Sequence, residues 1–514
     1  MSPATATPNS SAEVKPERRR TYGEIIKSSA LIGGSSLLNI GFSFIRTKAM
    51  ALWLGPSGVG LFSLYNSVYD VVRSLAGLGI YNSGVRQIAE AVSSQDASRI
   101  SRTVTILRRV AFGTGALGGL ILLFFCRPIS WLTFHDYQHA APLAWLGLAV
   151  FFADVSAGQI ALVQGMRRIA DLATLSVLGA FTGTVLSIPI IYFFRERGIV
   201  PSLVMVAAMG IVFSWWYARK VKVEPVAVSW RELLGETSAL LKMGFVFMAS
   251  SMMTLCVAYL VRIILVQKLN LEAAGFYQAA WSLGGLYFGF ILQAMGADFY
   301  PRLTAVAHNN TDCNRLVNEQ AEIGLLLAGP GVLGTLTFAP LVIELFYSQK
   351  FGPAVEVLRW ICLGMVLRVV SWPLGYILAA KGEAKLLFWT ELLGNALQVV
   401  LIWFGVGFFA LPGTGMGFFG LYIFYSVGIY FVVRRLSGFR WSPANRRLGG
   451  LLAVLVGIVF AAWYLFSHLV AGALGAAVTV VVGLYSLRTL CTLVPLDKLP
   501  KVLVKILRSI RLAR

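Results

Sequence analysis

Apolar residues fill most of the chain in runs of roughly 20, and short segments that carry most of the charges separate these runs. A helix that spans a bilayer needs roughly 20 mostly apolar residues. The pattern predicts fourteen spanning helices, and a count of twelve or thirteen also fits, because some boundaries between runs are indistinct. The predicted spans are 29–54, 58–83, 105–126, 141–164, 173–194, 198–217, 244–266, 273–297, 322–345, 354–379, 386–409, 413–433, 448–468 and 471–492.

The composition excludes a soluble protein. Of the 514 residues, 57% are hydrophobic and 13% are charged, whereas soluble domains have about 45–50% and about 25%. The mean hydropathy is +0.74, and no long polar stretch is left to fold as a water-exposed domain. The apolar runs are also continuous, whereas the strands of a membrane barrel alternate. The sequence therefore predicts an all-α polytopic membrane protein.

The basic residues indicate how the chain is oriented. The formal net charge is +21, which in a soluble protein would suggest nucleic acid. In a membrane protein, short cytoplasmic loops are rich in Lys and Arg. With a cytoplasmic N-terminus, 32 of the 44 Lys and Arg residues fall on the cytoplasmic side and five on the opposite side. We therefore expect both termini in the cytoplasm and no nucleic-acid partner.

The C-terminal segment 498–514 spaces its basic residues as one face of a helix. We expect it to lie along anionic lipids of the inner leaflet.

The sequence offers no sign of catalysis or of a cofactor. Its five cysteines form no C-x-x-C motif, and His135 and His139 have no third metal ligand nearby. No nucleotide-binding glycine loop is present. The longest predicted outer loop, 127–140, has only 14 residues. We therefore expect no enzyme, no metal site and no cofactor.

The sequence repeats itself once, with a period near 215 residues. The segment L-G-P-S-G-V-G-L-F-S-L at 54–64 follows the first span, and L-N-L-E-A-A-G-F-Y-Q-A at 269–279 follows the seventh. Further matched positions are Arg86 with Arg302, Asp96 with Asp312, and Arg99 with Arg315. Six spans separate the copies, so both copies have the same orientation.

This repeat predicts two like-oriented six-helix bundles around a central cavity, with a C-terminal helix pair outside the repeat. The expected divisions are a cytoplasmic tail at 1–27, the first bundle at 28–220, a cytoplasmic linker at 221–243, the second bundle at 244–435, two extra transmembrane helices at 436–494 and a basic tail at 495–514.

Two motifs resemble a known family. The pattern L-G-P-x-G-x-G-x-F at 54–62 resembles polysaccharide transporters of the multidrug/oligosaccharidyl-lipid/polysaccharide exporter superfamily. The stretch A-G-L-G-I-Y-N-S-G-V at 76–85 is similar to the Wzx-type flippases of O-antigen and enterobacterial common antigen. The resemblance extends over the first twelve spans and is strongest at about 25–100. Family members commonly have twelve spans, so the last pair is a departure.

The resemblance implies a function in lipopolysaccharide or related polysaccharide biosynthesis. A flippase of this kind moves an undecaprenyl-pyrophosphate-linked oligosaccharide from the cytoplasmic to the periplasmic leaflet of the bacterial inner membrane by alternating access. Besides this lipid-linked oligosaccharide, the expected partners are a polysaccharide polymerase and a chain-length regulator.

Ionisable residues inside the spans point to a polar interior. They are Arg46, Lys48, Asp70, Arg73, Asp154, Arg262, Arg359, Arg368, Glu391 and Arg488. A charge at the centre of a spanning helix costs about 2.5–3.5 kcal/mol, so ten charges facing lipid would cost on the order of 25 kcal/mol. Most of them must therefore face a cavity, pair with one another or reach the membrane surface.

Polar residues on one face of the first, second and seventh spans define the candidate substrate contacts. The candidates are Asn39, Arg46, Lys48, Asn66, Arg73 and Arg262. Arginine matches the geometry of phosphate oxygens, which suits a lipid pyrophosphate or an acidic sugar. An equally good alternative is that Arg73 pairs with Asp70 at i, i+3. For Arg359, Arg368 and Arg488, snorkelling or pairing between helices is the favoured interpretation.

The acidic residues Asp70, Asp154 and Glu391 are candidates for proton coupling. Glu391 has Asn395 one turn later, so hydrogen bonding between helices is as good an interpretation for it.

Two other functions remain open. A cation-coupled multidrug exporter of the same superfamily would share the fold, but the basic residues inside the spans disfavour cationic drugs. An O-antigen ligase or polymerase would need a large periplasmic loop, which the predicted topology lacks.

Overall fold

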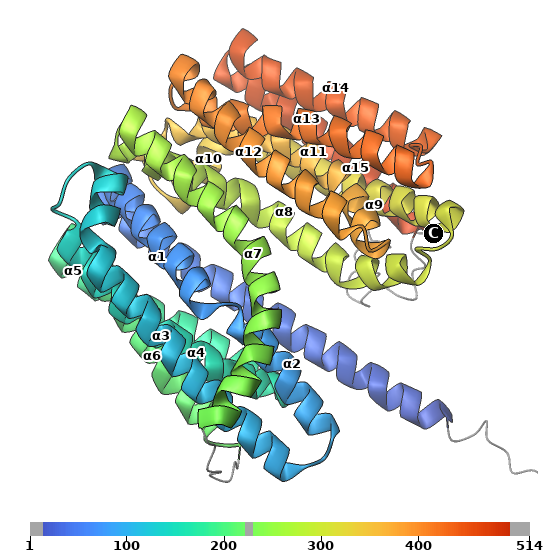
Figure 1. Cartoon of the computed structure of the whole chain (residues 1–514). Coiled ribbons are helices and arrows are strands. Elements are labelled where there is room, and N and C mark those ends of the chain that lie inside the picture. The colour runs from blue at the N-terminus through green and yellow to red at the C-terminus, as the bar shows by residue number, and fades with distance from the viewer. Residues whose placement is uncertain (1–13, 222–229, 494–514) are drawn as a thin grey trace, which may run out of the picture. The chain divides into compact units, whose positions relative to one another are not determined.

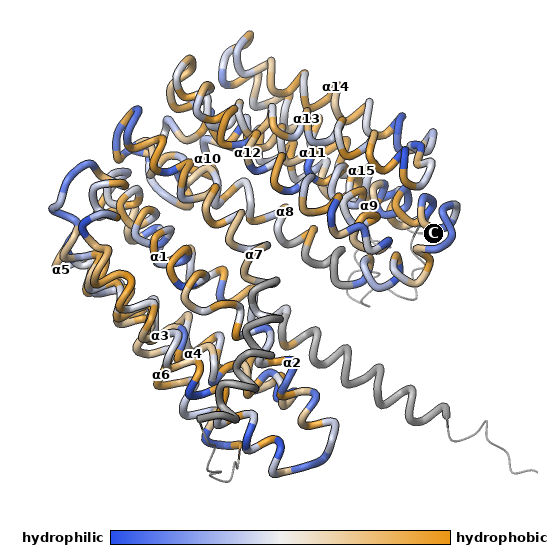
Figure 2. The backbone as a smooth tube through the Cα atoms, in the orientation of Figure 1, coloured by the Kyte–Doolittle hydropathy of each residue, from blue (hydrophilic) through white to orange (hydrophobic). Residues whose placement is uncertain are grey.

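The computed structural model describes the backbone of residues 14–221 and 230–493, and every regular element there is a helix (Figure 1). The helices are α1 (Val14–Gly77), α2 (Ile80–Ser93), α3 (Ala97–Phe134), α4 (Ala140–Gly165), α5 (Ile169–Phe194), η1 (Arg195–Gly198), α6 (Ile199–Ala218), α7 (Trp230–Lys268), α8 (Leu271–Ala305), α9 (Asn310–Thr337), α10 (Ala339–Phe346), η2 (Gln349–Phe351), α11 (Ala354–Ala380), α12 (Ala384–Phe409), α13 (Pro412–Ser437), α14 (Pro443–Leu465) and α15 (His468–Leu493). Hydrophobic residues cover most of their length, and hydrophilic residues gather toward their ends (Figure 2). The prediction of an all-helical polytopic protein is confirmed.

In the described residues, fewer helices meet the length and hydropathy criteria for a span than the fourteen predicted. Nine helices in the described part of the chain are long and apolar enough to cross a membrane, and α9 with α10, bent by 79°, would make a tenth. Here α5 and α6 count as one segment, Ile169–Ala218. The predicted fourteen is therefore approximate. The second predicted span is also shorter than expected, because α1 ends at Gly77 and not at residue 83.

Two helices begin inside segments that the sequence assigned to connections. α1 begins at Val14, within the predicted tail at 1–27, and α7 begins at Trp230, within the predicted linker at 221–243. The basic C-terminal tail at 495–514 lies outside the described residues.

A break divides α1 where the sequence placed its first turn. Gly55 has φ 68° and ψ −166°, in a region that side chains with a Cβ rarely adopt, and Pro56 follows it. Proline lacks the N–H that would continue the helical hydrogen bonds. The L-G-P motif therefore ends one helical segment and starts the next.

The chain folds into two compact units. Unit 1 contains residues before Leu54 together with Tyr65–Met252, and unit 2 contains Leu54–Leu64 together with the chain from Met253 onward. Two helices are the most buried of the apolar helices: α4, which packs on α2, α3 and α6 in unit 1, and α11, which packs on α8, α9 and α13 in unit 2.

The predicted repeat is visible in the backbone. Arg195, after α5, has φ 53° and ψ −134°, and Ala410, after α12, has φ 52° and ψ −134°. These two residues are 215 positions apart. Arg167 and Gly382, also 215 apart, both have positive φ after α4 and α11. Helices α4–α5 and α11–α12 are therefore equivalent, residue for residue, at this offset.

The C-terminal helix pair belongs to unit 2, where α14 and α15 pack on α9. A Cβ at Gly329 of α9 would lie 2.9 Å from Leu452 of α14, so this glycine permits the close approach. The Arg359 guanidinium lies 4.1 Å from the centre of the Trp463 ring on α14. This contact between helices is one of the roles that the sequence favoured for Arg359.

Candidate functional site

The most buried carboxylate among the predicted site residues is that of Asp154 on α4, at the centre of unit 1. Its side chain is 7% exposed, and its Oδ1 lies 3.4 Å from Nε of Arg73 on α1. The Arg73 guanidinium also lies 5.9 Å from the centre of the Tyr69 ring. A Cβ on Gly77 would lie 3.4 Å from Asp154 Oδ1, so α1 presents a glycine where it passes this carboxylate.

Asp70, one turn before Arg73, has a different neighbour. Its Oδ2 accepts a 2.8 Å hydrogen bond from Nδ2 of Asn66. The structure thus connects two predicted substrate contacts, Asn66 and Arg73, to two predicted coupling carboxylates, Asp70 and Asp154. The ion pair between Arg73 and Asp154 was not foreseen, because it joins residues 81 positions apart.

The remaining unit 1 candidates line the first segment of α1. Asn39 donates a 2.6 Å hydrogen bond from Nδ2 to Oγ of Ser176 on α5. Arg46 and Lys48 are half-buried, and neither of them is free of interactions within the chain.

Arg262 on α7 is the basic candidate in unit 2, and its side chain is held in place. The residue is 8% exposed. Its Nη1 donates to the carbonyl oxygen of Ala258 at 2.6 Å, and its Nη2 donates to Oε1 of Gln278 at 2.6 Å. Gln278 in turn donates to Oγ of Ser282 at 2.9 Å. These bonds hold the guanidinium beside Gln278 and Ser282 of α8.

Unit 2 also contains a polar cavity that the sequence did not reveal. It has a volume of about 400 Å³ and is lined by α11, α12 and α13. Arg368 and Trp372 of α11, Glu391 of α12, and Tyr422 and Tyr425 of α13 contribute to its wall. Arg368 and Glu391 come together only because α11 and α12 pack side by side. The sequence assigned Arg368 to snorkelling or pairing; the structure places it at this cavity.

Asn395 does not bind the carboxylate of Glu391. Its Nδ2 donates instead to the Glu391 backbone carbonyl at 2.9 Å. This hydrogen bond lies within α12 and involves the backbone of Glu391.

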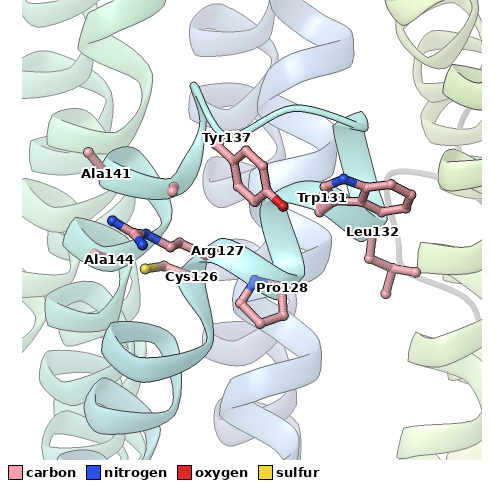
Figure 3. Close-up of a pocket in the computed structure, with 9 residues that line it drawn as sticks. Cys126, Arg127, Pro128, Trp131, Leu132, Tyr137, Ala141 and Ala144 are labelled. Atoms are coloured by element: carbon pink, nitrogen blue, oxygen red, sulfur yellow. The ribbon is translucent and has the colours of Figure 1, made fainter.

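A second hollow lies at the turn between α3 and α4 in unit 1 and contains none of the predicted site residues (Figure 3). It has a volume of about 1210 Å³, and its wall includes Arg127, Trp131 and Tyr137. Trp131 and Tyr137 are 48% and 61% exposed. Amphipathic aromatic rings with a basic residue are typical of a helix end at a membrane surface.

At this turn, His139 packs within the protein. Its Nδ1 lies 2.8 Å from the Tyr65 hydroxyl, and its ring stacks on Phe134 with centres 3.9 Å apart. The described residues hold no group of three or more ligands that could bind a metal ion.

Comparison with known proteins gives a consistent result. Residues 49–356 match the family model described as polysaccharide biosynthesis protein. The Lipid III flippase of Escherichia coli (strain K12) is 23% identical over 427 residues, which cover 80% of this chain and 99% of that protein.

Solved structures show the same fold. The chain is similar to the Lipid II flippase MurJ in its inward closed conformation, with a TM-score of 0.67, 13% identity and coverage of 90% of this chain and 99% of that one. It is also similar to an inward-facing multidrug resistance MATE family transporter of the MOP superfamily, with a TM-score of 0.61, 16% identity and coverage of 78% and 98%. The family match confirms the resemblance to polysaccharide transporters that the sequence motifs suggested, the solved structures share its fold, and the chain is an integral membrane protein.

Proposed function

Because the chain belongs to the family of polysaccharide biosynthesis proteins, we propose that it is a flippase for a polyprenyl-pyrophosphate-linked oligosaccharide. It moves the glycan and the pyrophosphate from the cytoplasmic to the periplasmic leaflet of the bacterial inner membrane, and the repeat unit of O-antigen or a related surface polysaccharide is the expected cargo. The chain makes and breaks no covalent bond. Both of its termini lie in the cytoplasm.

The observation that carries this proposal is the combination of the family match with buried charge in both units. Unit 1 contains the ion pair of Arg73 and Asp154, and unit 2 contains the hydrogen-bonded Arg262. A transmembrane helix bundle with an apolar cargo has no use for such groups, because each buried charge costs free energy. A cargo that carries phosphates and hydroxyls can exchange hydrogen bonds with these groups during passage.

Each candidate residue has a role in the proposal. Arg46 and Lys48 in unit 1 and Arg262 in unit 2 contact the pyrophosphate or an acidic sugar, because charge-assisted hydrogen bonds replace the water that these anions lose. Asn39, Asn66 and Arg73 complete the substrate contacts. Asp70, Asp154 and Glu391 are the candidates for proton coupling. On the periplasmic side, a polymerase and a chain-length regulator consume the product.

A cation-coupled multidrug exporter is the second candidate, because a MATE family transporter has the same fold. The basic residues Arg46 and Lys48 in unit 1, and Arg262 and Arg368 in unit 2, would however repel a cationic drug. We therefore favour the anionic lipid-linked substrate.

The proposal is tested by complementation. A bacterial strain that lacks its polysaccharide flippase is supplied with this chain, and surface polysaccharide is measured at matched amounts of membrane-inserted protein. Restored polysaccharide supports the proposal. Drug resistance without restored polysaccharide favours the exporter.

A further inference from the structure

The cavity of about 400 Å³ inside unit 2 has a composition that the fold itself does not require. Its defining side chains are Arg368, Trp372, Tyr376, Glu391, Tyr422 and Tyr425. We call it the α11–α13 cavity. Its volume falls within the range of small-molecule sites, roughly 300–1,000 Å³.

The internal repeat supplies a control for this cavity. At the offset of 215 residues, Arg368, Trp372 and Tyr376 correspond to Ala153, Ala157 and Ala161 of α4. Glu391 corresponds to Ser176 of α5. The same helices therefore pack in unit 1 with three alanines and a serine, so these large and charged side chains serve something other than the packing of the repeat.

The cavity is lined by two charged side chains, Arg368 and Glu391, that do not pair with each other in the described residues. In the described part of the chain, neither the Arg368 guanidinium nor the Glu391 carboxylate makes a hydrogen bond or an ion pair with another residue. Arg368 on α11 and Glu391 on α12 both line the cavity, together with Tyr425 on α13. The guanidinium and the carboxylate can therefore form charge-assisted hydrogen bonds with a ligand that enters the cavity.

Aromatic rings form the other part of the wall. The ring centres of Trp372 and Tyr376 on α11 lie 4.4 Å apart, and those of Tyr422 and Tyr425 on α13 lie 6.1 Å apart. Such rings offer apolar faces, and the tyrosines add hydroxyl groups. Pyranose rings have a complementary surface, with C–H groups on one face and hydroxyls around the edge.

The pair of opposite charges selects the class of ligand. A cation attracted to Glu391 would meet Arg368, and an anion attracted to Arg368 would meet Glu391. A sugar hydroxyl both donates and accepts hydrogen bonds, so an uncharged sugar satisfies the guanidinium and the carboxylate at once. We propose that the α11–α13 cavity is a binding subsite for an uncharged sugar ring of the transported glycan.

This inference rests on the proposed function, since it assigns the glycan of that substrate to a place within unit 2. It also gives Glu391 a role that differs from proton coupling. In the subsite, Glu391 accepts hydrogen bonds from sugar hydroxyls, whereas a coupling carboxylate would exchange protons and leave sugar affinity unchanged.

The experiment measures binding of soluble sugars to the purified full chain in detergent by saturation-transfer difference NMR. The probes are N,N′-diacetylchitobiose and lactose as neutral sugars, sialic acid as an anion and tetraphenylphosphonium as a cation. The variants are Trp372→Leu, Arg368→Gln and Glu391→Gln. Trp389→Leu is the matched control, because Trp389 is on α12, is 56% exposed and is not among the residues that line the cavity.

We expect at least one neutral sugar to bind the wild-type chain and the Trp389→Leu control equally. Arg368→Gln and Glu391→Gln should each weaken this binding about tenfold, the effect of losing one net hydrogen bond to a charged group. Trp372→Leu should abolish the signal. A thermal melting curve of each variant checks that the variant remains folded.

Three results would overturn the subsite. They are the absence of neutral-sugar binding to the wild-type chain, neutral-sugar binding that the cavity variants leave unchanged, and selective binding of the charged probes. If the wild-type chain restores polysaccharide in the flippase-deficient strain while any of these results holds, only the subsite is wrong. If it restores none, the proposed function itself fails.

Discussion

Arg73 of α1 and Asp154 of α4 form an ion pair inside unit 1, with 3.4 Å between Nε and Oδ1. The two exposures differ, since the side chain of Asp154 is 7% exposed and that of Arg73 is 41% exposed. If the pair were broken, the buried Asp154 carboxylate would therefore lose more stabilisation than the more exposed Arg73 guanidinium.

We predict that Arg73→Gln lowers the melting temperature of the detergent-solubilised protein, because it leaves the Asp154 charge buried without its cation. Breaking a fully buried pair costs about 3–5 kcal/mol, and the partial exposure of Arg73 reduces this cost. The double variant Arg73→Gln/Asp154→Asn should recover part of the loss. Arg86→Gln is the control, because the pair of Arg86 and Glu90 is exposed and contributes little. Equal stability of Arg73→Gln and the wild type would contradict the structural role of the pair.

The sequence was sufficient to predict the all-helical fold, the break at Gly55 and the repeat, because each of these leaves a local or periodic signal. It was not sufficient to predict which side chains contact one another. The spacing of Arg73 and Asp70 at i, i+3 suggested a pair, but packing of α4 against this part of the chain brings Asp154 to Arg73. Likewise, Arg368 and Glu391 look unrelated in the sequence, since only the packing of α11 against α12 and α13 places both at the wall of one cavity.

A second prediction concerns two repeat-related glycines in unit 2. A Cβ on Gly60 would collide with the carbonyl oxygen of Leu271, and a Cβ on Gly275 would collide with that of Pro56. Gly60→Ala and Gly275→Ala should each destabilise the protein, by about 1–3 kcal/mol for an overpacked contact. Thermal melting checks this, with Gly450→Ala as control, since a Cβ there meets nothing within 4 Å. If all three variants melt alike, the close approach is absent in solution.

A third prediction concerns the pyrophosphate contacts. Arg46→Ala and Arg262→Ala should each reduce export of surface polysaccharide, because a charge-assisted hydrogen bond contributes about 1.5–3 kcal/mol, or roughly tenfold or more in affinity. The lysine variants should restore part of the activity, since the charge remains but the planar fork of donors is lost.

The control for this series is Arg488→Ala, because Arg488 is exposed on α15 and belongs to the helix pair outside the repeat. Arg262 also bonds to Gln278, so melting temperatures must be compared before activities. Wild-type export by both folded alanine variants would remove Arg46 and Arg262 from the substrate path.

A fourth prediction concerns topology. A reporter that is active only in the cytoplasm should be active when it is fused after Arg514, because 32 of the 44 Lys and Arg residues lie on the cytoplasmic side of the proposed topology. Activity from a periplasm-specific reporter at the same site would require an odd number of spans.

The central claim is that the chain moves a lipid-linked oligosaccharide across a bilayer. The most direct measurement uses proteoliposomes that contain the purified chain and an undecaprenyl-pyrophosphate-linked oligosaccharide in both leaflets. A membrane-impermeant lectin in excess titrates the glycan that reaches the outer surface over time. We predict that the accessible fraction rises beyond the outer-leaflet share, and that it rises more slowly with Arg46→Ala. An accessible fraction equal to that of protein-free liposomes, with a chain that melts as a folded protein, would contradict the account.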